Sequence, residues 1–182
     1  MIKKILEYCV NLCYYISKVG KVIWMEKETK PTIFNVADFY LKIVDRDSGS
    51  TITPLKLQKI LYYSQGYYLA MNDKELFSEE FEAWAHGPAN EAIYNKYRIY
   101  GFDSIPEPTE YDVNFSKEIS DFLNDIWETF GIYDGKFLEI QTHNEEPWIE
   151  ARKDCKVGEK CKNIISKKSM QSFFKKVLNG EQ

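Results

Sequence analysis

Apolar residues recur at helical spacing along most of the chain, with polar residues on the opposite faces. Apolar side chains three and four positions apart form one stripe of a helix, so each such stretch predicts an amphipathic helix. The stripes predict helices at about residues 33–46, 89–100, 117–130 and 167–179, with two further short helices beginning after Asp134 and Thr142. Residues 54–71 are apolar around most of the circumference, which is typical of a helix buried in the middle of a domain. Thr53 and Pro54 predict its start, because threonine caps helices and proline loses no hydrogen bond there.

One short stretch follows a different period. Residues 81–84, Phe-Glu-Ala-Trp, alternate apolar and polar side chains, which predicts a strand with Leu76 and Phe77 as its candidate partner. The His-Gly-Pro sequence that follows ends this strand. We therefore predict a mainly α fold of the α+β type: a single compact helical domain with a small β-hairpin or sheet.

The first 30 residues form a segment of their own. Apolar positions over residues 2–23 follow three- and four-residue steps, which predicts an extra N-terminal amphipathic helix. The polar stretch that follows ends at Pro31 and is typical of a linker. We expect two parts, residues 1–30 as helix and linker and residues 31–182 as the main domain. The helix could pack on the domain, contact a partner or lie on a membrane surface, and Met25 is a candidate alternative start.

Charge and composition narrow the class of protein. Four lysines against one glutamate give residues 1–25 a net charge of +3, which leaves −7 for the remainder of a chain whose total is −4. An acidic body repels a phosphate backbone, so we expect no nucleic-acid binding through the main domain. No apolar run approaches the ~18–20 residues of a membrane span. Four cysteines in 182 residues do not make a disulfide scaffold, so we expect a cytoplasmic protein in a reducing compartment.

Three stretches are more specific than a generic helical pattern. They are TPLKLQK, LYY and QGY within residues 53–67, LF, FEAWAHGP, Tyr94, Tyr97 and YG within residues 76–101, and TH with EPW within residues 142–148. In this order and spacing they resemble the Panacea domain, or SocA-like antitoxin, family over about residues 33–175. Tyr67 stands where the family often has tryptophan, and Ala89 where a branched residue often follows the Gly-Pro.

The resemblance implies a mainly helical domain with a small sheet that serves as an antitoxin. Members of the family resemble direct protein binders that hold a toxin from a neighbouring gene inactive, and some act as adaptors that deliver the toxin to a protease. The expected partner is therefore a protein. The alternative is the same domain used by a phage or mobile element to inhibit a host or defence protein.

Polar residues of the central helix mark a candidate binding site. Gln58, Tyr62 and Gln65 share one stripe, and buried amides and phenols need hydrogen-bond partners. These residues form either an internal network that fixes helix packing or a polar pocket for a partner side chain or small ligand. The full set of candidate binding residues is Lys56, Gln58, Tyr62, Gln65, Trp84, His86, Thr142, His143 and Trp148.

The histidines and cysteines are the candidate residues for a less favoured alternative, a small-ligand or metal-dependent enzyme. His86 and His143 are the chain's two histidines, and neither lies in a spacing such as H-E-x-x-H. The cysteines at positions 9, 13, 155 and 161 could be assembled into a zinc site, but the spacing of the second pair departs from the usual pattern. We expect no catalytic residues, no metal and no cofactor, and a protein that is not an enzyme.

Overall fold

The computed structural model describes residues 12–16, 22–26, 30–111 and 113–181, which fall into two units divided between Lys30 and Pro31. The first unit contains a β-hairpin. Strands β1 (Leu12–Ile16) and β2 (Val22–Glu26) pair antiparallel, with Leu12 opposite Glu26 and Ile16 opposite Val22.

The predicted N-terminal helix over residues 2–23 is wrong where the structure describes it, because residues 12–16 and 22–23 lie in strands. Both segments are rich in aromatic and β-branched residues, which fit a pleated surface better than a helix. Apolar residues are so dense here that helical and strand periods both fit the pattern. The rest of the predicted helix lies outside the described residues.

The second unit confirms the predicted fold class: its described residues are mainly α-helical, with one small antiparallel hairpin. The helices are α2 (Ile33–Ile43), α3 (Pro54–Asn72), α4 (Glu91–Tyr97), the short 3-10 helix η1 (Arg98–Tyr100), α5 (Lys117–Phe130), α6 (Gly135–Thr142), α7 (Glu146–Arg152) and α8 (Lys167–Leu178). None of the helices in the described residues is long and apolar enough to cross a membrane.

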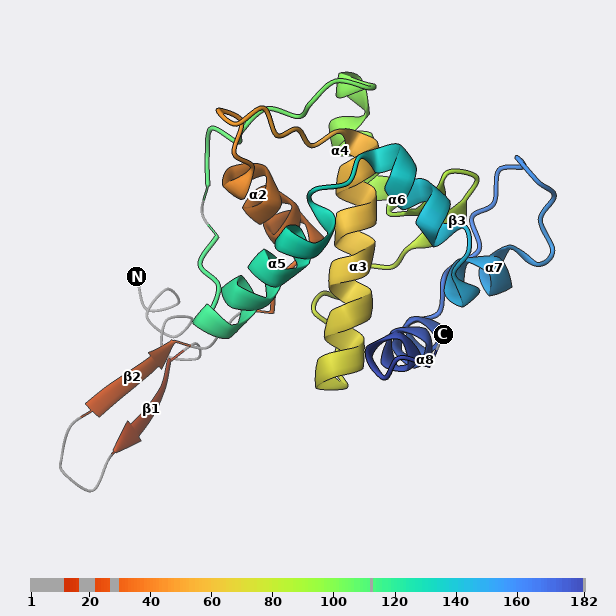
Figure 1. Ribbon diagram of the computed structural model, residues 1–182. Helices are drawn as coiled ribbons and strands as arrows, with labels where there is room; N and C mark the ends of the chain where they lie inside the picture. The colour runs from red at the N-terminus through yellow and green to blue at the C-terminus, as the bar shows by residue number, and fades with distance from the viewer. Residues whose placement is uncertain (1–11, 17–21, 27–29, 112, 182) are drawn as a thin grey trace, which may run out of the picture. The chain divides into compact units, whose positions relative to one another are not determined.

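Helix α3 runs through the middle of this unit, with α2 and α5 on one side and α8 on the other (Figure 1). As predicted, Thr53 caps it by accepting from the Lys56 N–H, and Pro54 occupies the first turn. The buried ring of Tyr62 on α3 meets the rings of Phe81 and Phe174 edge-on, both with centroids 5.7 Å away. The core thus forms around α3, where the apolar circumference predicted it.

Three further caps follow the sequence signals and one does not. Ser116, Asp134 and Ser166 accept from the backbone N–H groups three residues later and begin α5, α6 and α8. The prediction that Thr142 caps a helix is wrong. Thr142 is the last residue of α6, and its hydroxyl donates to the Glu139 carbonyl one turn back. Threonine satisfies its hydroxyl equally well in this way inside a helix, so the residue type alone does not locate a cap.

Strand β3 (Glu82–Trp84) lies where a strand was predicted, but its predicted partner is wrong. It pairs with β4 (Gly87–Ala89), and Glu82 also bridges to Ile164. Gly87 has a φ of +86°, a conformation that glycine adopts without strain, and it lets the chain reverse directly after Trp84.

Cys155 and Cys161 form a disulfide in the segment between α7 and α8. This bond was not predicted, because the cysteine count argued against a disulfide scaffold and for a reducing compartment, where disulfides are rare. The chain folds back here and brings the two Cα atoms to 6.2 Å, a separation that disulfides require and sequence spacing does not reveal. With these thiols bonded to each other, they are not available for the zinc site considered above. Among the described residues, no group of three or more histidine, cysteine, aspartate or glutamate side chains is placed to hold a metal ion.

Candidate protein-binding groove

The two glutamines on the central helix bind backbone groups of the domain itself. Gln58 donates to the Asn90 carbonyl (2.9 Å) and accepts from the Asn90 N–H (2.8 Å). Gln65 donates to the Phe77 carbonyl (2.8 Å) and accepts from the N–H groups of Leu76 (3.0 Å) and Phe77 (3.3 Å). Both amides are buried, so each replaces hydrogen bonds that the chain would otherwise make with water. Leu76 and Phe77, which were predicted to pair with β3, are hydrogen-bonded to Gln65 instead.

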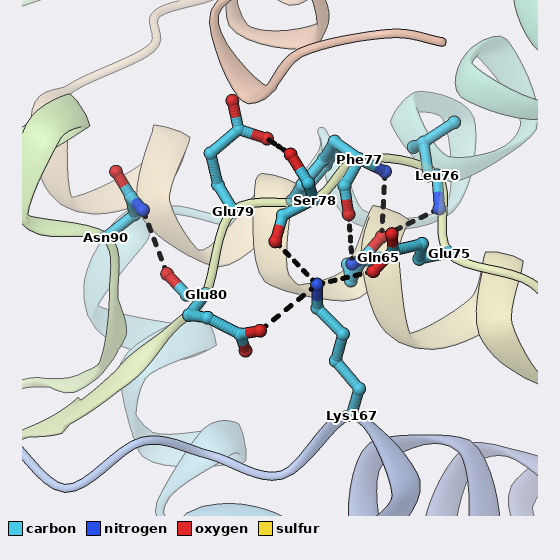
Figure 2. A network of polar contacts seen from close by, with 9 residues as sticks. All are labelled: Gln65, Glu75, Leu76, Phe77, Ser78, Glu79, Glu80, Asn90 and Lys167. Atoms are coloured by element: carbon cyan, nitrogen blue, oxygen red, sulfur yellow. Dashed lines mark hydrogen bonds and ion pairs between the residues drawn. The ribbon is translucent and has the colours of Figure 1, made fainter.

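Figure 2 shows how this network extends to α8. The Lys167 ammonium donates to the Ser78 carbonyl (2.6 Å) and pairs with Glu75 (2.6 Å) and Glu80 (3.3 Å). Asn90, which caps α4, donates to the Glu80 carbonyl (2.9 Å). The irregular segment 75–80 is therefore fastened from both α3 and α8, and it leads directly into β3.

Lys56 serves as an anchor between α3 and the end of α5. Its ammonium donates to the carbonyls of Gly131 (2.6 Å) and Thr51 (3.1 Å) and lies 5.0 Å from the centre of the Trp127 ring. Burial lowers its pKa, and the nearby Asp134 acts in the opposite direction. A cation suits this position because the C-terminal end of a helix carries partial negative charge.

A second buried polar cluster lies beside Tyr62 and includes Lys59, a residue that sequence reasoning missed. Lys59 is 1% exposed and donates to the Pro88 carbonyl (3.0 Å), while Tyr63 donates to Glu145 (3.0 Å). Burial lowers the pKa of Lys59 to about 7 and raises the pKa of Glu145 to about 7. Burial and the Glu145 carboxyl together raise the pKa of Tyr62. The signal was present: a lysine inside a stretch apolar on all sides has no solvent-facing side to occupy.

His143, Trp148 and Trp84 form a connected set that joins α7 to β3. The His143 ring stacks on Trp148 at 4.2 Å, and the Trp148 indole donates to the Trp84 carbonyl (3.0 Å). Arg152 adds a bond of 2.7 Å to the Ala83 carbonyl. Burial lowers the pKa of His143, which favours the neutral ring. These contacts hold strand β3 of the hairpin against α7.

Three of the nine predicted residues, Gln58, Trp84 and His86, line a groove of about 670 Å³. Its walls come from the start of α3, the β3–β4 hairpin, α4 with the loop after η1, and the start of α6. In Figure 1, α4 and α6 lie at the end of α3 where that helix begins. The remaining six predicted residues lie outside the lining, in the buried contacts described above.

The groove and its edges carry exposed aromatic side chains. Phe102 is 98% exposed and Tyr94 is 41% exposed, and the Tyr94 ring meets Trp84 edge-on at 4.9 Å. Tyr133 and Phe137 flank the lining residues 134–136 in sequence, stack at 4.4 Å and are both partly exposed. Clustered exposed apolar side chains mark interaction surfaces, and aromatic residues dominate binding energy there.

The acidic groups that line the groove have hydrogen-bond partners within the domain, whereas one of its cations has none among the described residues. Glu139 accepts from Lys136 (3.0 Å) and from His86 (3.1 Å). Burial opposes its ionisation, yet these two donors hold the pKa of Glu139 below its usual value. Asp134 accepts from the Phe137 N–H (2.7 Å). Arg98 is exposed, and within the described part of the chain its guanidinium donates to no carboxylate or carbonyl.

A comparison with protein families finds a match to the model described as Antitoxin SocA-like, Panacea domain, over residues 57–149. The matched stretch contains most of α3, the hairpin, α4 and α6, and therefore most of the groove lining. No curated protein and no solved structure matches the chain.

Proposed function

Because the chain belongs to the Panacea domain family of SocA-like antitoxins, we propose that it neutralises a cognate toxin by direct protein–protein binding. The observation that carries this proposal is the groove of about 670 Å³ edged by Phe102, Tyr94 and Trp84. Aromatic side chains bring a large contact area at small cost in conformational entropy, which suits them to bind a protein rather than to transform a substrate.

The buried networks beneath the groove support a binding role. Gln58 ties the α3 wall to the start of α4, and Lys59 ties α3 to the hairpin through the Pro88 carbonyl. A surface held in this way loses little freedom when a partner arrives, and binding then retains more of its contact energy. The toxin would be inactivated by occupation of its surface, and the same contact could present it to a protease.

The net charge of the body favours a basic partner. With −7 on the chain after residue 25, long-range attraction would raise the association rate of a cationic toxin. This attraction acts at a distance and is independent of the local contacts in the groove.

The experiment is capture of the tagged full-length protein from its native cells, with the captured proteins identified by mass spectrometry. A stoichiometric partner encoded by the neighbouring gene supports the antitoxin function. A host or defence protein would favour the phage or mobile-element inhibitor, and capture of nothing but the chain itself would remove the binding proposal.

Two matched variants test whether the captured partner binds in the groove. Phe102→Asp places a charge on a fully exposed groove aromatic, and Val157→Asp makes the same kind of change on an exposed residue of the loop after α7. We expect Phe102→Asp to weaken capture of the partner and its neutralisation in a growth assay about tenfold or more, and Val157→Asp to leave both unchanged.

A further inference from the structure

We propose that the groove receives an amphipathic segment of the partner whose apolar side chains enter between α4 and α6 and whose carboxylate pairs with Arg98. The inference rests on the proposed function in taking the groove as a protein-binding surface. It goes further in stating the chemistry of the segment that binds.

The first argument is that the acidic groups of the groove are already occupied. Glu139 is 3% exposed and is held by Lys136 and His86, and Asp134 is held by the first turn of α6. A basic side chain of a partner that entered here would have to compete with donors already in place. Carboxylates that are bound in this way offer little to an incoming cation.

The second argument is that the groups of the groove with unused hydrogen-bonding capacity are cationic. Arg98 lines the groove, is exposed, and has no acceptor within the described part of the chain. Lys136 is about two-thirds exposed and uses one ammonium contact on Glu139. A guanidinium offers five N–H donors in a planar fork that matches a carboxylate in two parallel hydrogen bonds. The charge complementary to this rim is therefore negative.

The third argument is the apolar character around the cation. Arg98 lies in the same short segment as Ile99, which is 78% exposed, and Phe102, which is 98% exposed. Arginine beside exposed aromatic residues is the composition of an energetic hot spot. An acidic side chain alone would leave these apolar groups in water, so the occupant must supply apolar side chains as well.

The chain's overall charge restricts the occupant further. A strongly acidic tract would be repelled by the −7 carried after residue 25, whereas a single carboxylate in an apolar segment meets only the local field of the groove. The segment we propose is thus apolar with an isolated acidic residue, and it can belong to a toxin that is basic as a whole.

The test uses a phage-displayed library of random linear peptides, selected on the immobilised full-length protein. We expect peptides that combine Trp, Phe or Leu with a nearby Asp or Glu. Arg98→Glu should reverse the charge preference toward Lys or Arg. Lys153→Glu, which changes the net charge equally at an exposed site at the end of α7, should select the same peptides as the unmodified protein.

A selected acidic peptide is then synthesised and its affinity measured. Arg98→Glu should weaken it about tenfold or more, and replacing the peptide's acidic residue by lysine should restore binding to that variant. The proposal is overturned if no peptide is selected above background, if selected peptides show no acidic preference, or if Arg98→Glu and Lys153→Glu behave alike. A toxin captured equally well by Arg98→Glu would preserve the proposed function while rejecting this segment chemistry. If acidic apolar peptides bind but no toxin is captured, the segment chemistry is preserved and the proposed antitoxin function is rejected.

Discussion

At the scale of single residues, Lys59 and Glu145 are two buried ionisable groups whose pKa values burial shifts to about 7. Burial raises the pKa of Glu145 from 4.5 to about 7, so the folded protein holds a proton in this range that the unfolded chain has lost. The contribution of Glu145 to the free energy of unfolding therefore falls as pH rises from 4.5 to about 7.

Glu145→Gln should remove this dependence while keeping an acceptor for Tyr63. The variant should match the unmodified protein near pH 4.5 and become more stable by about 1–3 kcal/mol near pH 7, because it never ionises. Urea unfolding across this range measures the difference. A difference that stays constant with pH would contradict the assignment, because it would mean that Glu145, which is electrostatically coupled to Lys59, titrates alike in the folded and unfolded states.

Gln65 gives a second residue-scale prediction. Gln65→Leu would leave the N–H groups of Leu76 and Phe77 and the Phe77 carbonyl without partners in a buried site, at a cost of about 2 kcal/mol or more. Gln141→Leu makes the same substitution on the exposed side of α6 and should change stability by less than about 0.5 kcal/mol. Equal midpoints for the two variants in chemical denaturation would show that the Gln65 amide has no structural role.

The residue types indicated which polar side chains would be buried and hydrogen-bonded, but not which groups would be their partners. The sequence predicts that buried Gln58 and Gln65 need hydrogen-bond partners but does not identify them, and in the structure both amides bind backbone groups. Every residue except proline carries a backbone donor and every residue a carbonyl, so a backbone partner leaves no mark in the sequence. The exposure of Phe102 is not evident from the sequence either, because phenylalanine is among the residue types most often buried.

At the scale of elements, α3 packs closely against α8 at Gly66. A Cβ atom on Gly66 would lie 2.1 Å from a ring carbon of Phe174, so glycine is what allows the two helices to approach. The benefit of alanine over glycine in a helix, about 1 kcal/mol, is smaller than the cost of this overlap.

Gly66→Ala should therefore lower the free energy of unfolding by about 1–3 kcal/mol. The same substitution made together with Phe174→Leu should cost less than it does alone, because the smaller side chain vacates the overlap. A double-mutant cycle by thermal or urea unfolding measures this coupling. Additive effects would mean that α8 moves away from α3 without strain.

Elements with one dominant period were predictable, and the first unit was not. Helix α5 places Leu123 and Ile126 on a single buried stripe, and the predicted helix ends where α5 ends, at Phe130. In residues 12–26, by contrast, Tyr15, Ile16 and Val22 fit either a helix stripe or a strand. The pairing of Tyr15 with Ile23 across the hairpin decides between the two, and that pairing is not local in sequence.

At the scale of the whole molecule, the chain divides between Lys30 and Pro31 into two compact units. The described core of the second unit runs from Ile33 to Phe174. A protein that begins at Pro31 should therefore unfold at the same temperature as the full chain, within about 2 °C, and keep its helical circular dichroism. A marked fall would show that residues 1–30 contribute to the stability of the second unit.

The groove has four walls, and they come from stretches of chain that meet only after folding: the start of α3, the hairpin, α4 with its loop, and the start of α6. A partner that fills the groove binds the folded state alone, so it shifts the folding equilibrium in proportion to its concentration and affinity. Proteases that act on transiently opened chains would then degrade the free protein faster than the bound one. The lifetime of this protein in a cell would therefore report how much partner is present.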